Sequence, residues 1–282
     1  MKYEIIMHII GMSFVIIGIL TYFSAHPAIA QEAFTVRELP CARGGMTIYG
    51  KAYIPRGRGR RTAVIISHGF GGTHASSAPY AEAFAKSGVA SYIFDFCGGS
   101  DDSKSGGSML EMSVLTEADD LNAVIDFVET LDFVDADNLF LMGRSQGGYV
   151  SALVASRRMA EVRGLVLLYP AFVIDEDMRR LRDSEDGIPE RHEIMGSAVG
   201  RVYFEDALKV DIYNEIKGYG RDVLIMHGDM DETVPVSCSE RAAEIYESAE
   251  LVVLEGAGHG FQGTQLAWAV KKALEYIAGH RR

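Results

Sequence analysis

The residues GRSQGG, at positions 143–148, place Ser145 between two glycines directly after the apolar run LFLM. A serine in a Gly-x-Ser-x-Gly spacing is typical of a sharp strand-to-helix turn that presents the hydroxyl as a nucleophile. Glycine and serine also occur in ordinary loops between a strand and a helix. A serine hydroxyl is a weak nucleophile, which needs a base and a group that orients the base. The interpretation of Ser145 therefore depends on what the rest of the chain supplies.

Two later segments offer the base and the orienting carboxylate. HGDMDETVP (227–235) follows the apolar run DVLIM, and EGAGHGF (255–261) follows LVVL. The order along the chain is Ser145, then an aspartate, then His259, which is the order found in α/β hydrolases. The first segment contains two candidate aspartates, Asp229 and Asp231. These motifs predict a serine hydrolase that forms an acyl-enzyme and needs no metal or organic cofactor.

An early glycine-rich loop, HGFGG (68–72), offers a site for the oxyanion of such a reaction. In α/β hydrolases one oxyanion donor is the backbone N–H of the residue after the serine, which here is Gln146. The second donor comes from a loop after an earlier strand. We assign this role to the backbone N–H of Phe70.

The pattern of apolar residues along the chain predicts the elements that position these motifs. Short apolar runs rich in β-branched residues alternate with segments of helical periodicity. The expected strands are 47–55, 62–70, 91–96, 139–143, 164–170, 222–228 and 249–256. The expected helices are 76–88, 116–131, 146–159, 239–249 and 268–280. This alternation predicts an α/β fold, with a mostly parallel sheet that is covered by helices on both faces.

One stretch breaks the alternation. At about residues 173–220 the periodicity is weaker and charged residues are frequent. Long segments over a binding site are often lids, so we expect a cap inserted into one hydrolase domain that spans residues 31–282. A mobile surface excursion is the alternative.

The chain resembles the α/β-hydrolase superfamily over about residues 45–279, and more narrowly the bacterial cinnamoyl (feruloyl) esterases. The resemblance rests on HGFGG, GRSQGG and the two later motifs, together with FDFCGGSDDS (94–103) and MSVLTEADDLNAVIDFV (112–128). It implies that Asp231, rather than Asp229, orients the histidine.

The resemblance also implies a substrate class. In the feruloyl esterases, cap residues at positions roughly matching Asp177 and Tyr203 hold the phenolic hydroxyl of the substrate. The chain departs from that group at Arg144, where a histidine commonly precedes the serine, and in the sequence of its cap. We therefore expect a carboxylic ester hydrolase that favours hydroxycinnamate esters, either small or linked to polysaccharide. The alternatives are a short-chain acyl esterase, a lipase-like enzyme or a serine peptidase of this fold, and a non-catalytic binding protein.

The first residues and the composition bear on location and partners. Residues 5–23 are almost wholly apolar, and Ala28-Ile29-Ala30 fits a signal-peptidase site. We expect residues 1–30 to be a signal peptide cleaved near Ala30 and the protein to be exported; a retained membrane anchor that faces outside is the alternative. The formal net charge of −12 argues against a nucleic-acid partner. The three cysteines, an odd number, match no metal site and no disulfide framework.

Overall fold

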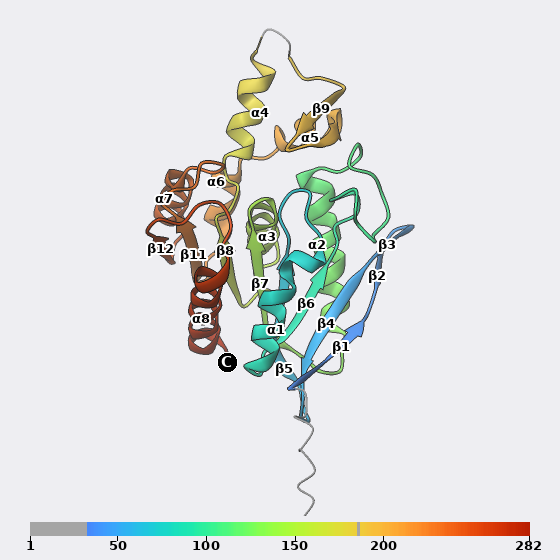
Figure 1. The fold of residues 1–282 in the computed structure, drawn as a ribbon, viewed down its shortest axis with the longest axis vertical. Helices are drawn as coiled ribbons and strands as arrows, with labels where there is room; N and C mark the ends of the chain where they lie inside the picture. Colours follow the sequence, from blue (N-terminus) through green and yellow to red (C-terminus); the bar gives the residue numbers. More distant parts are fainter. Residues whose placement is uncertain (1–32, 185–186) are drawn as a thin grey trace, which may run out of the picture. The chain divides into compact units, whose positions relative to one another are not determined.

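An eight-stranded sheet forms the centre of the part of the chain described by this computed structural model, which covers residues 33–184 and 187–282 (Figure 1). The predicted signal peptide lies outside the described residues. Six strands of this sheet run parallel to one another, namely β5, β6, β7, β8, β11 and β12. The other two, β1 and β4, are antiparallel to their neighbours. In spatial order the strands are β1 (Phe34–Glu38), β4 (Gly50–Pro55), β6 (Ala90–Phe94), β5 (Arg61–Ser67), β7 (Val134–Arg144), β8 (Gly164–Leu168), β11 (Val223–Gly228) and β12 (Ala249–Leu254).

Helices cover both faces of this sheet. One face packs against α1 (Ala78–Lys86) and α8 (Gly263–His280). The other packs against α2 (Val114–Glu129), α3 (Gln146–Arg157) and α7 (Val236–Ile245). The alternation of side chains along β5 shows why both faces are apolar, because Val64 and Ile66 contribute to the first core and Ala63 and Ile65 to the second. The predicted α/β architecture is confirmed.

The sequence pattern missed the exposed edge of the sheet. Strand β1 was not predicted, because four of its five residues are exposed and so give no apolar alternation. A small hairpin of β2 (Cys41–Arg43) and β3 (Met46–Ile48) was also missed, apart from its last residues, because its strands are only three residues long. The expected strand 47–55 is interrupted at Tyr49, which separates β3 from β4.

The segment that was predicted to be a cap, residues 173–220, lies between β8 and β11 and contains regular elements of its own. These are α4 (Ile174–Arg182), β9 (Arg191–Ile194), β10 (Ser197–Gly200), α5 (Arg201–Ala207), α6 (Ile212–Glu215) and the 3₁₀ turn η2 (Ile216–Gly218). Strands β9 and β10 form an antiparallel hairpin. Figure 1 shows α4, β9 and α5 beyond one end of the sheet. We call residues 173–220 the cap segment below.

The three cysteines carry free thiols. Burial raises the pKa of Cys41 to about 11 and that of Cys97 to about 12, which keeps both thiols protonated and unreactive. Among the helices that the structure describes, none combines the length and the apolar character of a membrane-spanning segment. No three His, Cys, Asp or Glu side chains of these residues come together in a group that could hold a metal ion.

Two glycines beside the turn from β7 to α3, one in each element, leave no room for a side chain. A Cβ atom on Gly143 would lie 2.2 Å from the carbonyl oxygen of Gly147. A Cβ atom on Gly147 would lie 2.2 Å from the carbonyl oxygen of His68. Both contacts are with backbone atoms, so a rotamer change cannot relieve them. The glycines therefore allow the end of β7, the start of α3 and the loop after β5 to touch.

Replacing Gly143 by alanine should destabilise the protein by about 3 kcal/mol or more, because the backbone must move to make room. Urea unfolding measures the loss. The matched control is Gly279→Ala in α8, where a Cβ meets no atom within 4 Å. This control should be as stable as the parent protein or up to about 1 kcal/mol more stable. Equal stability of Gly143→Ala and the parent would contradict the close packing described here.

Candidate active site

The structure brings together three side chains that the sequence singled out. His259 Nε2 lies 2.9 Å from Ser145 Oγ, and His259 Nδ1 lies 2.7 Å from Asp231 Oδ2. The three residues follow β7, β11 and β12, which are parallel strands whose carboxyl ends lie at the same edge of the sheet. With the Nδ1–H donating to the carboxylate, Nε2 is free to accept the proton of the serine hydroxyl.

Ser145 has a backbone conformation that is rare for a residue with a side chain. Its φ is +52° and its ψ is −123°, directly before the first residue of α3. Such angles lift the hydroxyl out of the line of the strand and aim it toward His259. Gly69 leaves room for this, since a Cβ at that position would lie 3.1 Å from the Cβ of Ser145.

The choice between the two candidate aspartates follows from their positions. The side chain of Asp231 is fully buried, and its Oδ1 accepts hydrogen bonds of 2.9 Å from the backbone N–H groups of Thr233 and Val234. These bonds leave Oδ2 for His259. Asp229 is exposed, and its Oδ1 instead accepts a bond of 2.6 Å from the backbone N–H of Gly256. Only Asp231 is therefore placed to orient the histidine.

A second histidine supports Asp231 from behind. His227 Nε2 lies 3.2 Å from Asp231 Oδ2 and 3.0 Å from the carbonyl oxygen of Val234. Its Nδ1 lies 2.7 Å from the hydroxyl of Ser239, which can donate to it. Burial lowers the pKa of His227, so its ring is neutral at pH 7 and donates from Nε2. This arrangement fixes the carboxylate without adding a full positive charge next to His259.

Two backbone N–H groups lie where the sequence analysis expects an oxyanion site. Gln146 is the first residue of α3, where helical N–H groups have no partner within the helix. Phe70 lies in the loop after β5 and lines two cavities that also include Ser145. Among the described residues, neither N–H group donates to another protein atom. Both are thus available to an anionic oxygen bound beside Ser145.

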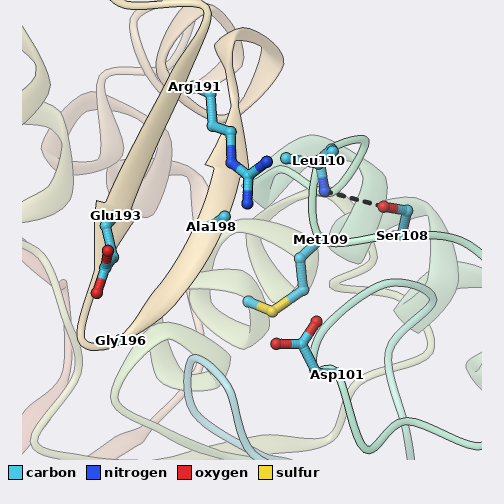
Figure 2. A pocket seen from close by; sticks show the side chains of 8 residues that line it. All are labelled: Asp101, Ser108, Met109, Leu110, Arg191, Glu193, Gly196 and Ala198. Atoms are coloured by element: carbon cyan, nitrogen blue, oxygen red, sulfur yellow. Dashed lines mark hydrogen bonds between the residues drawn. The ribbon is translucent and has the colours of Figure 1, made fainter.

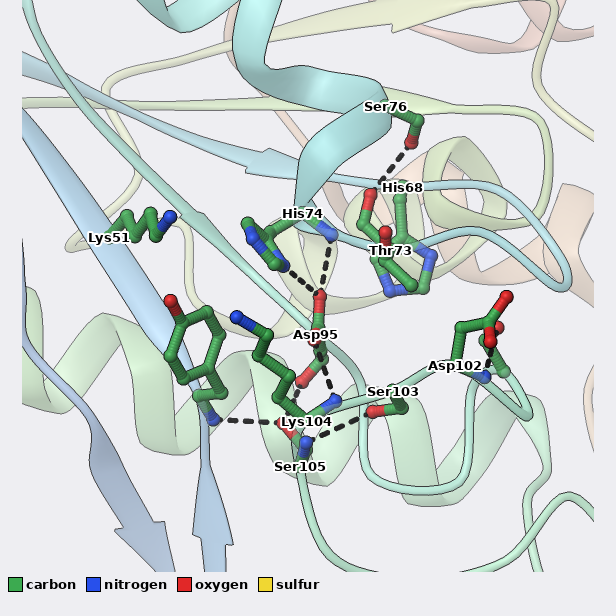
Figure 3. A network of polar contacts seen from close by, with 12 residues as sticks. Lys51, His68, Thr73, His74, Ser76, Asp95, Asp102, Ser103, Lys104 and Ser105 are labelled. Carbon is green, nitrogen blue, oxygen red and sulfur yellow. Dashed lines mark hydrogen bonds and ion pairs between the residues drawn. The ribbon is translucent and has the colours of Figure 1, made fainter.

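The loop that carries Phe70 is anchored by two buried histidines. His68 Nδ1–H donates to the carbonyl oxygen of Gly69 at 2.8 Å, while Nε2 accepts from the Phe96 N–H at 3.1 Å. Burial lowers the pKa of His68 to about 4, in keeping with this neutral form. Figure 3 shows the second anchor, in which the backbone N–H and the ring Nδ1 of His74 bond to Asp95 Oδ1 at 2.5 and 2.7 Å. The loop is therefore held in place before any ligand binds.

Two cavities meet at Ser145. One, of about 220 Å³, extends toward the cap segment, and we call it the cap-side cavity. It is lined by Phe70, Ser145, Gln146, Ala171, Val173, Ile174, Asp177, Met178, Ile194, Met195, Tyr203, Thr233 and Val234. The other, of about 240 Å³, contains the histidine, and we call it the histidine-side cavity. It is lined by Gly69, Phe70, Gly72, Ser76, Arg144, Ser145, Tyr169, Met195, His259 and Gly260.

Asp177 and Tyr203, the two residues carried over from the feruloyl esterases, both line the cap-side cavity. Asp177 is in α4 and pairs with Arg180 at 2.6 Å. Tyr203 is a buried residue of α5 whose ring packs edge-on against Phe70, with the ring centres 5.9 Å apart. The cap segment thus contributes one acidic and one phenolic side chain to a cavity that is otherwise mostly apolar.

A third cavity is larger but lacks the groups for this chemistry. It has a volume of about 360 Å³ and lies between the β9–β10 hairpin and the loop at residues 101–110 (Figure 2). Its charged lining residues are Asp101, Arg191 and Glu193. Ser145, Asp231 and His259 do not line it. Chemistry rather than size therefore identifies the pair of cavities at Ser145 as the candidate active site.

A buried chain of polar side chains, which no sequence motif indicates, lies behind the candidate oxyanion site. The side-chain amide of Gln146 donates to Glu117 Oε2 at 2.9 Å and accepts from the Tyr203 hydroxyl at 2.8 Å. Glu117 belongs to α2 and is fully buried; burial raises its pKa to about 8. The carboxyl is therefore mostly protonated at pH 7. This chain joins α2, the start of α3 and the cap segment through Gln146.

The raised pKa of Glu117 predicts a pH-dependent stability. Between about pH 4.5 and pH 8 the unfolded state has lost this proton while the folded state keeps it. The free energy of unfolding should therefore fall as the pH rises through this range, with a contribution from Glu117 of up to about 1.4 kcal/mol per pH unit. Glu117→Gln should remove that contribution. Urea unfolding at four pH values from 5 to 8 measures it.

The control for this experiment is Glu82→Gln, which changes the same charge at an exposed position of α1. Its stability should follow the pH in parallel with that of the parent protein. If the Glu117→Gln curve is also parallel to the parent curve, the carboxyl is ionised in the folded state and the assignment of a protonated Glu117 is wrong.

Comparison with known proteins agrees with this geometry. Residues 58–211 match the family described as serine aminopeptidase, S33. The structure of Est1E from Butyrivibrio proteoclasticus with bound ferulic acid is similar, with 25% identity, a TM-score of 0.79, and 86% of this chain and 98% of that one covered. Dienelactone hydrolase from Anabaena variabilis shares the fold at 16% identity and a TM-score of 0.61, over 89% of this chain and 100% of the other. A comparison with curated proteins gives no match.

The family match covers more than half of the chain and includes the segments that hold Ser145 and the candidate oxyanion donors. The strand order, the covering helices and the site at the carboxyl ends of the strands agree with it. The chain belongs to the serine aminopeptidase S33 family and is a serine hydrolase of the α/β-hydrolase fold.

Proposed function

We propose that this protein hydrolyses carboxylic esters through an acyl-enzyme, with Ser145 as the nucleophile, His259 as the base and Asp231 as its orienting group. The observation that carries the proposal is the hydrogen-bonded series Ser145–His259–Asp231 at the junction of two cavities. A non-catalytic binding protein would have no need for this alignment, because it contributes to reaction and not to affinity.

The mechanism follows from the positions of these groups. His259 Nε2 takes the proton of Ser145 as Oγ attacks the ester carbonyl carbon. The carbonyl oxygen becomes an oxyanion, which accepts hydrogen bonds from the N–H groups of Phe70 and Gln146. His259 then protonates the alcohol oxygen as the carbon–oxygen bond breaks, and the alcohol leaves an acyl-Ser145. Water, deprotonated by His259, attacks the acyl carbon and releases the acid.

For the acyl group we favour a hydroxycinnamate. The cap-side cavity adjoins the proposed oxyanion donor Gln146, so the acyl chain of a bound ester extends into it. Its walls offer two aromatic rings, Phe70 and Tyr203, for an aromatic acyl group and a carboxylate, Asp177, for a phenolic hydroxyl. The similar Est1E structure contains ferulic acid, which is a group of this class.

A short aliphatic acyl group is the second candidate. The same cavity has apolar side chains from the cap segment and from the residues just before it. These are Ala171, Val173, Ile174, Met178 and Ile194. Such a lining favours an acyl chain without polar groups.

We also propose that the protein is exported after cleavage near Ala30, as the A-x-A pattern of the sequence suggests. An ester linked to a polysaccharide is accessible only outside the cell, so this location fits the favoured substrate.

The first experiment compares hydrolysis of methyl ferulate, p-nitrophenyl acetate and p-nitrophenyl butyrate by the mature protein and by Ser145→Ala. The variant should lose about three to six orders of magnitude in kcat, because no other group can form the acyl-enzyme. Ser87→Ala, an exposed serine at the end of α1, is the control and should keep full activity.

The pattern of substrates decides between the candidates. Efficient turnover of methyl ferulate supports the hydroxycinnamate class, whereas turnover of the acetate and butyrate alone supports the short aliphatic class. Turnover of an aminoacyl p-nitroanilide but of none of the esters would instead indicate a peptidase. Equal rates for Ser145→Ala and the parent protein would show that Ser145 is not the nucleophile.

The two aspartates of the loop after β11 allow a second, matched test. Asp231→Asn should lower kcat by several orders of magnitude, because it reverses the hydrogen bond that sets the tautomer of His259. Asp229→Asn removes the same charge two residues away and should leave kcat within about threefold of the parent value, since Asp229 bonds only to loop backbone. A large loss in Asp229→Asn with none in Asp231→Asn would reverse the assignment.

A further inference from the structure

Arg144 is the residue next to the proposed nucleophile, and its role is not explained by the reaction steps above. It is the last residue of β7. Arg144 lines the histidine-side cavity together with Ser145 and His259, and its guanidinium group reaches Ser76, which also lines that cavity. A permanent positive charge therefore lies beside the reacting groups.

The position of the guanidinium group is fixed by uncharged neighbours. Its Nη2 donates to Ser76 Oγ at 2.6 Å, and the Ser76 hydroxyl donates in turn to the carbonyl oxygen of Thr73 at 2.7 Å. The guanidinium carbon lies 5.6 Å from the centre of the Tyr80 ring. These contacts hold the side chain in one place but do not neutralise its charge.

Among the described arginines that have no ion-pair partner, Arg144 is the one that lines a cavity together with Ser145. Arg157 pairs with Glu215 at 3.0 Å, and Arg241 pairs with Glu176 at 2.8 Å. Among the described residues no carboxylate forms an ion pair with Arg144, although the protein carries a net charge of −12. The Nε atom of Arg144 is buried and has no acceptor within the described chain. A partly buried cation that lines a cavity and has no carboxylate partner is suited to bind an anion from outside.

The histidine-side cavity is also where the alcohol portion of an ester substrate would lie. His259 must deliver a proton to the alcohol oxygen of the ester, so the alcohol portion lies on the side of His259. The acyl portion lies in the cap-side cavity, where the charged residue is the acidic Asp177. An anionic group is thus favoured near Arg144 and disfavoured in the cap-side cavity.

We infer that Arg144 forms a subsite for a carboxylate on the alcohol portion of the substrate. The protein would then favour esters of hydroxy acids over esters of neutral alcohols. The guanidinium group can donate a charge-assisted hydrogen bond to such a group. This inference rests on the proposed ester hydrolysis, and the experiment below separates the two.

The experiment uses two acetate esters that differ only in charge, 4-acetoxyphenylacetate and 4-acetoxyphenylacetamide. The carboxylate and the amide are separated from the phenol by a methylene group, which keeps the reactivity of the two esters similar. We expect kcat/KM for the carboxylate to exceed that for the amide by about ten- to a hundredfold, as for a hydrogen bond to a charged group. Arg144→Gln should bring this ratio close to one, and Arg144→Lys should keep part of it.

Two controls address other origins of the preference. Arg157→Gln removes the same charge at an exposed ion pair and should keep the ratio of the parent protein. Adding salt should reduce the ratio only modestly if the carboxylate is bound at a partly buried site, and strongly if it is attracted from a distance. A ratio near one in the parent protein, or a ratio unchanged in Arg144→Gln, overturns the inference.

Turnover of the amide ester with no preference for the carboxylate would leave ester hydrolysis standing and reject the subsite. If neither ester is hydrolysed, ester hydrolysis is called into question, and the subsite is tested by binding alone. Ligand-observed NMR then compares 4-hydroxyphenylacetate and its amide on Ser145→Ala and on Ser145→Ala/Arg144→Gln. Binding of the carboxylate that is lost with Arg144 supports the subsite, and equal binding of the two compounds rejects it.

Discussion

The backbone turn at Ser145 is the constraint on which the rest of the site depends. A positive φ at a residue with a side chain costs about 1–3 kcal/mol, so surrounding bonds must hold it. The N–H of Ser145 donates to the carbonyl oxygen of Leu168 at 3.0 Å, and its carbonyl oxygen accepts from Gly148, Tyr149 and Ala171 at 2.9–3.1 Å. The turn is thereby tied to the end of β8 as well as to its own helix. The close packing of Gly143 and Gly147 on either side of the turn then fixes the direction of the hydroxyl group.

Buried acidic groups connect the cap segment to the sheet domain. The Tyr149 hydroxyl of α3 donates to Asp175 at 2.5 Å, and Asp175 also accepts from the N–H of Ile212 at 2.7 Å. The Ser113 hydroxyl, at the start of α2, donates to Asp206 at 2.5 Å. With the series from Glu117 to Tyr203, these bonds fix α4, α5 and α6 against the two helices behind the site. The cap-side cavity is therefore a preformed space rather than one made by a loose lid.

The fold and the residues that meet at the site could be predicted from the sequence, because the patterns that indicate them are local. Buried parallel strands give continuous apolar runs, and the residues that follow them must lie at one edge of the sheet. Strand β1 gives no such run, so it could not be foreseen. The burial of Glu117 could not be predicted from the sequence either. An acidic residue in the first turn of a helix is ordinarily exposed, where it interacts favourably with the helix dipole. The burial of Glu117 depends on Gln146 and Tyr203, which are distant in the chain.

The place of the cap segment in the chain has a consequence for how this enzyme family can diversify. The strands that border it, β8 and β11, are neighbours in the sheet, where Leu165 pairs with Val223. The connection between them can lengthen, shorten or be replaced without any change in strand order, and each doubling of a loop costs only about 0.6 kcal/mol of closure entropy. Evolution can therefore exchange the surface that we propose to select the acyl group while inheriting the proposed nucleophile and its base unchanged. Recombination at these two strand ends offers the same freedom to the protein engineer.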